Sequence, residues 1–541
     1  MSEMSSVCVA INDLFEFEGK SVPTERPDDA AIGAMVQRQF QFLPQPIQIN
    51  ISEKDVTIHF TEEASEAKEE AKRLGIKAGK RAAEGEYQKA VSTLKRVLEL
   101  HPSLHIARRD LAMSYIALGD TDNAKNQLID VLRLNPKDHW AWVTLGNLYI
   151  RHHNDLETGE RFLRRALEIA PNDPWTLNSL GGVLLERGRT QEAAGMFNRT
   201  LELDPKFANA YFGLAMIHLK NNNVQLIAST LAKMFACGKV QDARSAQVFA
   251  NARDLFADIQ PIIAKTQHGA TTQSVERLRL EMERVSGYPV RIVYEEFENK
   301  VAGSLQMAWK SGRDHHLLRC RKSYPEHLQP HMIAHELVHI QLEAEARRTG
   351  KNRFFISSAK SRETAIRRME RDIVGLEKRG YGQQAISEMI LSLIQSLTAF
   401  LLNCPIDMII ETRIHNTMPE LHAAQFLSLR LMANEAWEMN TNARSMELTP
   451  RLVSKTSFAL NGANALFIDD LFQGSSAYAS RYAKMETFER SKKLFRYWKE
   501  RFPALEPGGE YVLVDEFASM LGVRDFFEWK EDPDQGGGRP G

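Results

Sequence analysis

Four phrases in the first half of the chain end in proline at nearly equal intervals. They are Leu98-Glu99-Leu100-His101-Pro102, Leu132-Arg133-Leu134-Asn135-Pro136, Leu167-Glu168-Ile169-Ala170-Pro171 and Leu201-Glu202-Leu203-Asp204-Pro205. The prolines are 34, 35 and 34 residues apart, and residues typical of turns keep the same step at Gly85, Gly119, Asn154, Gly188 and Asn222. This period predicts a stack of units, each made of two helices joined by a turn.

The apolar positions of these units resemble those of the tetratricopeptide repeat (TPR). The first-helix pattern is matched by Trp142, Leu145, Gly146 and Tyr149, and the second-helix pattern by Ala124, Leu128, Ala193 and Phe197. The resemblance implies an α-solenoid over residues 68–240, with four proline-closed units and a degenerate fifth. The groove of such a solenoid is expected to bind a protein or peptide, as substrate or partner. The alternative is that the array only braces the rest of the chain.

Residues 1–67 precede the array and form an accessory segment. Within it, residues 47–51 and 56–60 alternate between apolar and polar side chains on either side of Ser52-Glu53-Lys54-Asp55. Such alternation around a short polar turn predicts a β-hairpin.

The second half contains His335-Glu336-Leu337-Val338-His339. On a helix, residues i and i+4 lie on one face, so His335 and His339 can bind one zinc ion while Glu336 accepts a proton from water. Apolar neighbours indicate a buried helix: Ile333, Ala334, Leu337, Val338 and Ile340. The alternatives are a chance match and a relic that no longer binds metal.

Strand patterns at Val290–Tyr294 and His315–Arg321 come before this helix, and more helices follow. This order resembles the zincin metallopeptidases, so we expect an α+β zincin-like domain over residues 287–450. The resemblance implies bound Zn²⁺ and an edge strand that pairs with the substrate backbone. Residues 315–321 are the positional candidate for that strand.

A catalytic zinc needs a third protein ligand. Glu343 lies a further turn beyond His339, too far along the helix to join the pair. The gluzincin pattern implies a glutamate from a later helix. Glu411 is the candidate, on a helix that Pro405 could open. Asp407 and His415 share its face, and Asp407 is expected to orient a histidine. Glu435 and His415 compete as ligands, and Glu411 could instead form a salt bridge with Arg413.

The resemblance implies peptide hydrolysis, with Glu336 taking a proton from the attacking water and returning it to the leaving amine. Candidates for a further donor to the oxyanion are His415, Tyr478 and Tyr482. The predicted function is a zinc-dependent metalloendopeptidase with a TPR array. One alternative is a non-enzymatic scaffold whose zincin-like domain is inactive or binds metal structurally. A hydrolase of small amides is a further alternative, which the array disfavours.

The composition of the chain bears on its partners and on its cellular compartment. The 69 basic and 70 acidic residues nearly cancel, so no overall field would attract nucleic acid. Four dispersed cysteines and an acidic N-terminus favour a reducing, cytoplasmic protein without a signal peptide. Residues 389–406 carry no charge, but their polar side chains favour a buried helix over a membrane span.

The expected division of the chain is completed by linker helices at 241–286 and a helical region at 451–541. The linker helices are expected to be interrupted at Gln267–Thr272. The last ten residues are expected to form a disordered tail.

Overall fold

The computed structural model describes residues 4–17, 20, 22–43, 47–61, 65–237, 240, 243–297 and 302–533. The chain divides into two compact units, residues 1–217 and 218–541. The five-part division expected from the sequence is finer than these two units. Most of the tail expected to be disordered, residues 534–541, lies outside the described residues.

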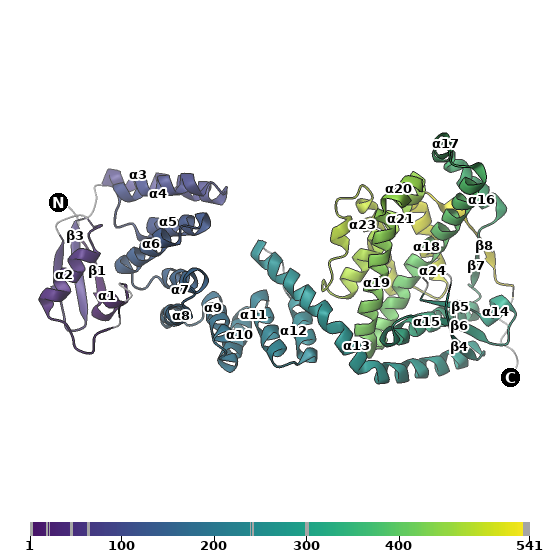
Figure 1. Ribbon diagram of the computed structural model, residues 1–541, viewed down its shortest axis with the longest axis horizontal. Coiled ribbons are helices and arrows are strands. Elements are labelled where there is room, and N and C mark those ends of the chain that lie inside the picture. Colours follow the sequence, from purple (N-terminus) through teal and green to yellow (C-terminus); the bar gives the residue numbers. More distant parts are fainter. Residues whose placement is uncertain are drawn as a thin grey trace. The chain divides into compact units, whose positions relative to one another are not determined.

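The first unit begins with a three-stranded antiparallel sheet in the order β1-β3-β2 (Figure 1). Its strands are β1 (Met4–Ala10), β2 (Gln48–Ile51) and β3 (Asp55–Thr61), and α1 (Ile11–Phe17) and α2 (Asp29–Gln39) lie between β1 and β2 in the chain. β2 and β3 pair with Ile51 opposite Val56, which confirms the predicted hairpin. The first strand was not predicted.

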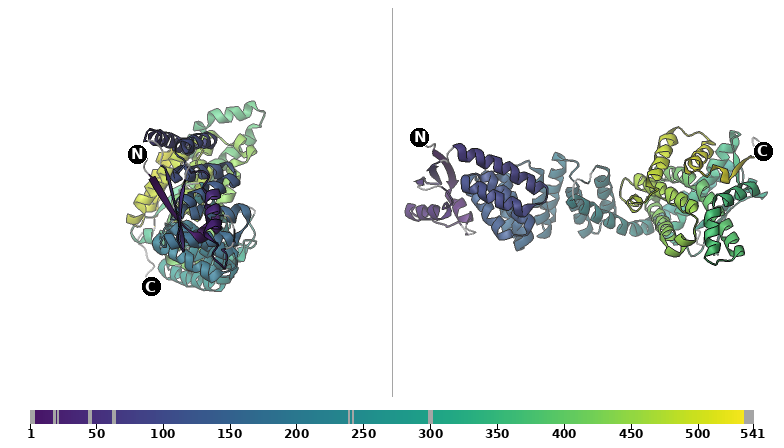
Figure 2. Two further views of the ribbon diagram at one scale, coloured as in Figure 1. Left: turned by 90° about the vertical axis from the view of Figure 1, so that its left-hand side faces the viewer. Right: turned by 90° about the horizontal axis from the view of Figure 1, so that it is seen from above.

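Helical hairpins follow the sheet, one after another along the chain (Figures 1 and 2). The helices are α3 (Ser65–Ala83), α4 (Tyr87–Leu100), α5 (His105–Leu118), α6 (Thr121–Leu134), α7 (His139–His153), α8 (Leu156–Ile169), α9 (Pro174–Glu186), α10 (Thr190–Leu203), α11 (Ala208–Lys220) and α12 (Val224–Cys237). Every predicted turn residue has a positive φ, from 53° at Asn154 and Asn222 to 79° at Gly119. The sequence therefore predicted the solenoid and its turns.

Close packing fixes the interior of the first unit. A Cβ atom on Gly181 or Gly213 would lie 2.7 or 2.4 Å from the ring of Phe197, so both positions need glycine. The N-terminal segment shares this core, because Phe17 stacks on the fully buried Trp142 at 6.2 Å between ring centroids. The accessory segment is thus packed onto the repeats.

The second unit contains one long helix, α13 (Ala243–Ser286). The break expected at Gln267–Thr272 is wrong, since the helix continues through it. Gly269 has open space around it, and the hydroxyls of Thr271 and Thr272 each donate to His268 O at 2.8 Å. α13 packs against α15 (Gln329–Arg348) and α19 (His422–Thr441). This tertiary packing overrides the weak local propensity.

A second three-stranded sheet precedes α15. It consists of β4 (Val290–Glu295), β6 (His316–Arg321) and β5 (Gly303–Gln306), in that spatial order. β6 is parallel to β4 and antiparallel to β5. Residues 315–321 therefore form the central strand, and the prediction that they form the edge is wrong. The short β5 is the edge strand, and the helix α14 (Ala308–Ser311) follows it.

The long helix α18 (Gln383–Thr417) packs against α15, α21 (Arg451–Leu471) and α24 (Gly509–Leu521). Pro405 lies inside this helix and does not open it. Among the described helices α18 alone is long and apolar enough to cross a membrane, although 33% of its most apolar window is buried.

Two helices, α16 (Ala359–Arg368) and α17 (Glu370–Lys378), precede α18 in the chain. The C-terminal region belongs to the same compact unit. Its helices are α20 (Ala443–Leu448), α21 (Arg451–Leu471), α22 (Ala479–Tyr482), α23 (Phe488–Arg501) and α24 (Gly509–Leu521). The last strand, β8 (Glu528–Glu531), pairs antiparallel with β7 (Arg353–Ile356). Residues 451–533 therefore build the same body as the predicted zincin-like domain.

Candidate metal centre

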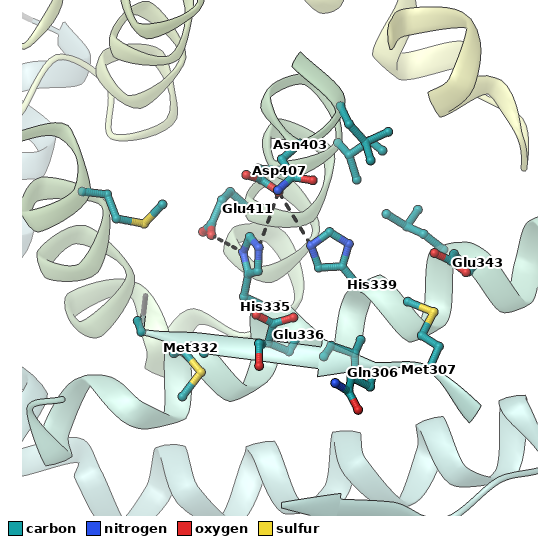
Figure 3. Close-up of a pocket in the computed structure, with 18 of the residues that line it drawn as sticks. Gln306, Met307, Met332, His335, Glu336, His339, Glu343, Asn403, Asp407 and Glu411 are labelled. Atoms are coloured by element: carbon teal, nitrogen blue, oxygen red, sulfur yellow. Dashed lines mark hydrogen bonds and ion pairs between the residues drawn. The ribbon is translucent and has the colours of Figure 1, made fainter. Parts of the chain in front are cut away.

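Two buried helices bring the predicted site residues together (Figure 3). α15 presents His335 and His339, and α18 presents Asp407 and Glu411. The two imidazole rings are 5.0 Å apart between centroids. His335, His339 and Asp407 can each turn one ligand atom toward a common point, and these three atoms lie within 4.8 Å of one another.

The environment of Asp407 fits a bound cation. Its Oδ1 atom lies 3.5 Å from His335 Nε2 and 3.7 Å from His339 Nε2. This oxygen is buried and has no hydrogen-bond partner among the described residues. Ligands about 2.0–2.1 Å from a tetrahedral zinc are separated by roughly 3.3–3.4 Å. The observed separations are close to that value, so the donor set suits a divalent metal with one open position.

Glu411 has a different environment, because both of its carboxylate oxygens are already used. His335 Nδ1 lies 2.8 Å from Oε1, and His331 Nε2 lies 2.9 Å from Oε2. Gln425 Nε2 donates to the same Oε2 at 2.7 Å and to the Glu411 carbonyl at 2.8 Å. Since a carboxylate accepts, Nδ1 of His335 carries a proton in this contact, and Nε2 is the ring nitrogen that faces Asp407.

The positions of the two carboxylates favour roles opposite to those expected from the sequence. Asp407 belongs to the group of possible ligands, and Glu411 contacts His335 Nδ1. Glu411 forms no salt bridge with Arg413 either, because that guanidinium pairs with Glu345 at 3.0 Å. The longer side chain of Glu411 reaches the Nδ1 side of the imidazole, whereas Asp407 faces the two Nε2 atoms.

Burial and neighbouring charges set the ionisation of the two glutamates. Burial raises the pKa of Glu411, but His331 and His335 outweigh it by their charges and hydrogen bonds and hold this pKa well below its usual range. Burial also raises the pKa of Glu336, to about 6, with His335 opposing and Asp407 reinforcing the shift. A carboxylate with a pKa near 6 is suited to accept and return a proton at neutral pH.

These groups open into a cleft of about 970 Å³. The strand β5 contributes one wall, and Figure 3 shows Glu336 projecting toward it. α15 lies so close to this strand that a Cβ atom on Gly303 would be 2.3 Å from Met332 Sδ. Further lining residues come from α14, α15, β6, β7, α18, α19 and the C-terminal region.

The other residues that the sequence offered as ligands or oxyanion donors lie outside the group of possible ligands, which is His335, His339 and Asp407. His415 Nδ1 pairs with Gln425 Oε1 at 2.9 Å, so His415 reaches Glu411 only through that glutamine. Glu435 lines the cleft without joining the ligand group. Tyr478 and Tyr482 are buried, and neither contributes to the cleft lining in the described part of the chain.

Glu343, which the sequence excluded as a ligand, accepts hydrogen bonds from Lys310 and from Trp309 Nε1. Sequence reasoning missed His331 and Gln425, although His331 stands four residues before His335 on the same helix face. That spacing was a usable signal, whereas nothing local marks Gln425.

Comparison with known proteins supports the repeats. Two tetratricopeptide repeat family models match, one over residues 81–138 and 115–175 and the other over 179–226. A curated relative is the BBSome complex member BBS4 of Bos taurus, 25% identical over 29% of this chain and 30% of its own length. Another is the aspartyl/asparaginyl beta-hydroxylase of Mus musculus, 32% identical over 17% of this chain and 12% of its own. The chain spans less than a third of either relative.

Solved structures with a similar solenoid include YrrB, described as a TPR protein with an unusual peptide-binding site. It has 21% identity and a TM-score of 0.27, and the match covers 32% of this chain and 88% of YrrB. MamA from Desulfovibrio magneticus has 17% identity and a TM-score of 0.29, covering 30% of this chain and 92% of MamA. The family-model matches show that residues 81–175 and 179–226 contain tetratricopeptide repeats, a scaffold that mediates binding of proteins and peptides.

Proposed function

We propose that the protein is a zinc-dependent metallopeptidase whose TPR array binds a protein substrate or partner. The observation that carries this proposal is Asp407 Oδ1, a buried carboxylate oxygen that lacks a hydrogen-bond partner among the described residues and faces two histidine Nε2 atoms. Burial of a carboxylate oxygen without a hydrogen bond is costly, so a cation at this point would offset that cost.

The chain's own residues would divide the work as follows. His335, His339 and Asp407 would hold zinc, which when bound supplies a Lewis acid for activating water and polarising a carbonyl. Glu336 would take the proton from the attacking water and return it to the amine nitrogen that leaves. Glu411, held by His331 and Gln425, would keep the Nδ1 proton of His335 in place and so direct Nε2 toward the metal.

The wall formed by β5 favours an extended peptide as substrate. Among the described strands β5 pairs only with β6, so its second edge offers backbone groups next to the cleft that no described strand pairs with. A peptide lying along Gly303–Gln306 could form main-chain hydrogen bonds with this edge, as in other cases of β-strand addition. We propose β5 for the role that the sequence assigned to residues 315–321.

A non-enzymatic scaffold is the second candidate. It is favoured by the comparisons, because the matched family models describe only repeats, over residues 81–226. On this alternative the second unit binds metal for stability or binds none. The two candidates differ in what happens when Glu336 is changed, since only the peptidase needs its carboxylate.

The deciding experiment combines metal content with peptide hydrolysis. Elemental analysis of the purified chain should give about one zinc per chain. Glu336→Gln should keep that zinc and the fold while lowering hydrolysis of a peptide library by about 10²- to 10⁴-fold. Glu326→Gln is the matched control, because that side chain is 84% exposed just before α15. Absence of metal would favour the bare scaffold, and zinc without hydrolysis would favour a structural ion.

A further inference from the structure

The cleft extends from the metal centre to an end built by the C-terminal region. Glu510 and Tyr511 from the first turn of α24 line this end, together with Trp529 of β8 and Phe355 of β7. None of these residues belongs to the candidate ligand group or to the hydrogen bonds around Glu411. The metal centre therefore leaves their role unexplained.

Glu510 is a second buried carboxylate with an unused oxygen. Its exposed fraction is 3%, and Oε1 has no hydrogen-bond partner among the described residues. Burial raises the pKa of Glu510 to about 7. A buried carboxylate without a counter-charge is destabilised, and a cation that entered the cleft would relieve this penalty.

No ion pair to Glu510 is formed among the described residues, although the charge of Arg413 lowers its pKa and that of Glu343 raises it. Three nearby cationic side chains are paired with other carboxylates: Lys310 with Glu343, Arg353 with Glu531 at 3.4 Å, and Arg413 with Glu345 at 3.0 Å. These partners balance the cationic charges, so an ionised Glu510 has no cation paired with it.

Three aromatic rings line the cleft together with this carboxylate. Trp529 packs edge to face against Phe355 at 5.5 Å and against Tyr511 at 5.1 Å between ring centroids. The hydroxyl of Tyr511 donates to Asn352 Oδ1 at 2.6 Å, which fixes its ring. Aromatic surfaces next to a carboxylate suit a ligand with an apolar stem and a cationic head, since the rings cover methylene groups and attract the positive charge.

We propose that this end of the cleft is a subsite for a lysine or arginine side chain of a bound peptide, with Glu510 as counter-charge and Phe355, Tyr511 and Trp529 around the stem. The inference rests on the proposed function, which places a peptide along β5. A free peptide N-terminus carries the same ammonium chemistry without the long stem, so peptides with blocked and free termini distinguish the two sources.

The test uses the full chain loaded with zinc and N-terminally acetylated peptides that carry one lysine, or norleucine of similar length, at each position in turn. A charge-assisted hydrogen bond predicts a lysine preference in kcat/KM of about tenfold to a hundredfold at one position. Glu510→Gln should bring that ratio close to one. Glu506→Gln, in the loop before α24 and 80% exposed, should keep the wild-type ratio.

Binding provides a readout that does not need turnover. Calorimetry on Glu336→Gln should show the same lysine preference in Kd, and the double variant with Glu510→Gln should lose it. Equal binding of both peptides by Glu336→Gln would overturn the subsite, as would a preference that survives Glu510→Gln. If the preference appeared only with free N-termini, the group bound in the subsite would be the terminal amine and not a side chain. If lysine peptides bind selectively but are never cleaved, the peptidase proposal fails and the subsite stands.

Discussion

Changing the two carboxylates of α18 separately should reveal which one binds the metal. Asp407→Asn removes the charged oxygen that faces both Nε2 atoms and leaves the hydrogen bonds of Glu411 untouched. Glu411→Gln keeps all three candidate ligands but replaces an acceptor by an amide, although His331, His335 and Gln425 all approach within 2.7–2.9 Å. At least one of these contacts would then place a donor against a donor.

The expected losses follow from the two roles. Zinc sites with four protein ligands bind with about 10–16 kcal/mol, so one ligand contributes roughly 3 kcal/mol, or about two orders of magnitude in affinity. Asp407→Asn should therefore weaken zinc binding by about a hundredfold or more. Loss of a group that only orients a ligand costs about 10- to 100-fold, so Glu411→Gln should lie below Asp407→Asn.

Zinc affinity should be measured by chelator competition at fixed pH. Cobalt substitution should accompany it, because the cobalt spectrum reports the ligand set directly. The spectrum should change for Asp407→Asn and stay close to wild type for Glu411→Gln. Glu435→Gln is the control, since this carboxylate lines the cleft outside the ligand group. If Glu411→Gln altered the spectrum and Asp407→Asn left affinity intact, the assignment of the two roles would be refuted.

Two stability measurements test other parts of the structure. The pKa of Glu510 is about 7 in the fold against 4.5 as the ordinary value, so its contribution to stability is fully present below pH 4.5 and is lost as pH rises through 7. This loss amounts to about 3 kcal/mol in the free energy of unfolding. Denaturant unfolding of wild type and Glu510→Gln at pH 5 and pH 8 should show that the variant lacks most of it. If both proteins showed the same pH dependence, the burial of this carboxyl group would be contradicted. Gly269→Ala should stabilise the chain by about 1 kcal/mol, because Gly269 is exposed within a continuous helix and has free space for a Cβ atom. If the variant were no more stable than wild type, the result would support the helix break predicted from the sequence.

The repeat half was predictable because its information is local and periodic. Each 34-residue unit repeats the same proline and turn positions, and the turns with positive φ fall where glycine or asparagine recurs. Most contacts of such a unit are made with its neighbours, so few distant residues could alter the outcome. The hairpin at residues 47–60 was predicted for the same reason, since its register depends on a four-residue turn.

Errors arose where tertiary packing decides the structure. The polar run at Gln267–Thr272 has weak helix propensity, yet α13 packs against two other helices and stays helical through it. Proline often stands at the start of a helix, but α18 continues through Pro405 because it packs against α21 and α24. The order of strands in the second sheet was also beyond the sequence, because β6, the last of the three strands in the chain, lies between β4 and β5.

The proposed exchange of roles between Asp407 and Glu411 follows from the geometry of the two helices. α15 presents His331, His335 and His339 at steps of four residues, and α18 presents its two carboxylates at the same step. The helices run in opposite directions, so the groups alternate: Glu411 lies between His331 and His335, and Asp407 lies between His335 and His339.

The distances from histidine nitrogens to carboxylate oxygens in this alternating series differ between Glu411 and Asp407. Those around Glu411 are 2.8 and 2.9 Å, short enough for direct hydrogen bonds, whereas those around Asp407 are 3.5 and 3.7 Å. The wider separation leaves room for an ion between ligands, and the narrower one excludes it. A sequence with three histidines and two acids at this spacing permits either register. Only the packing of α15 on α18 selects the register in which the shorter side chain, Asp407, faces the Nε2 atoms of His335 and His339.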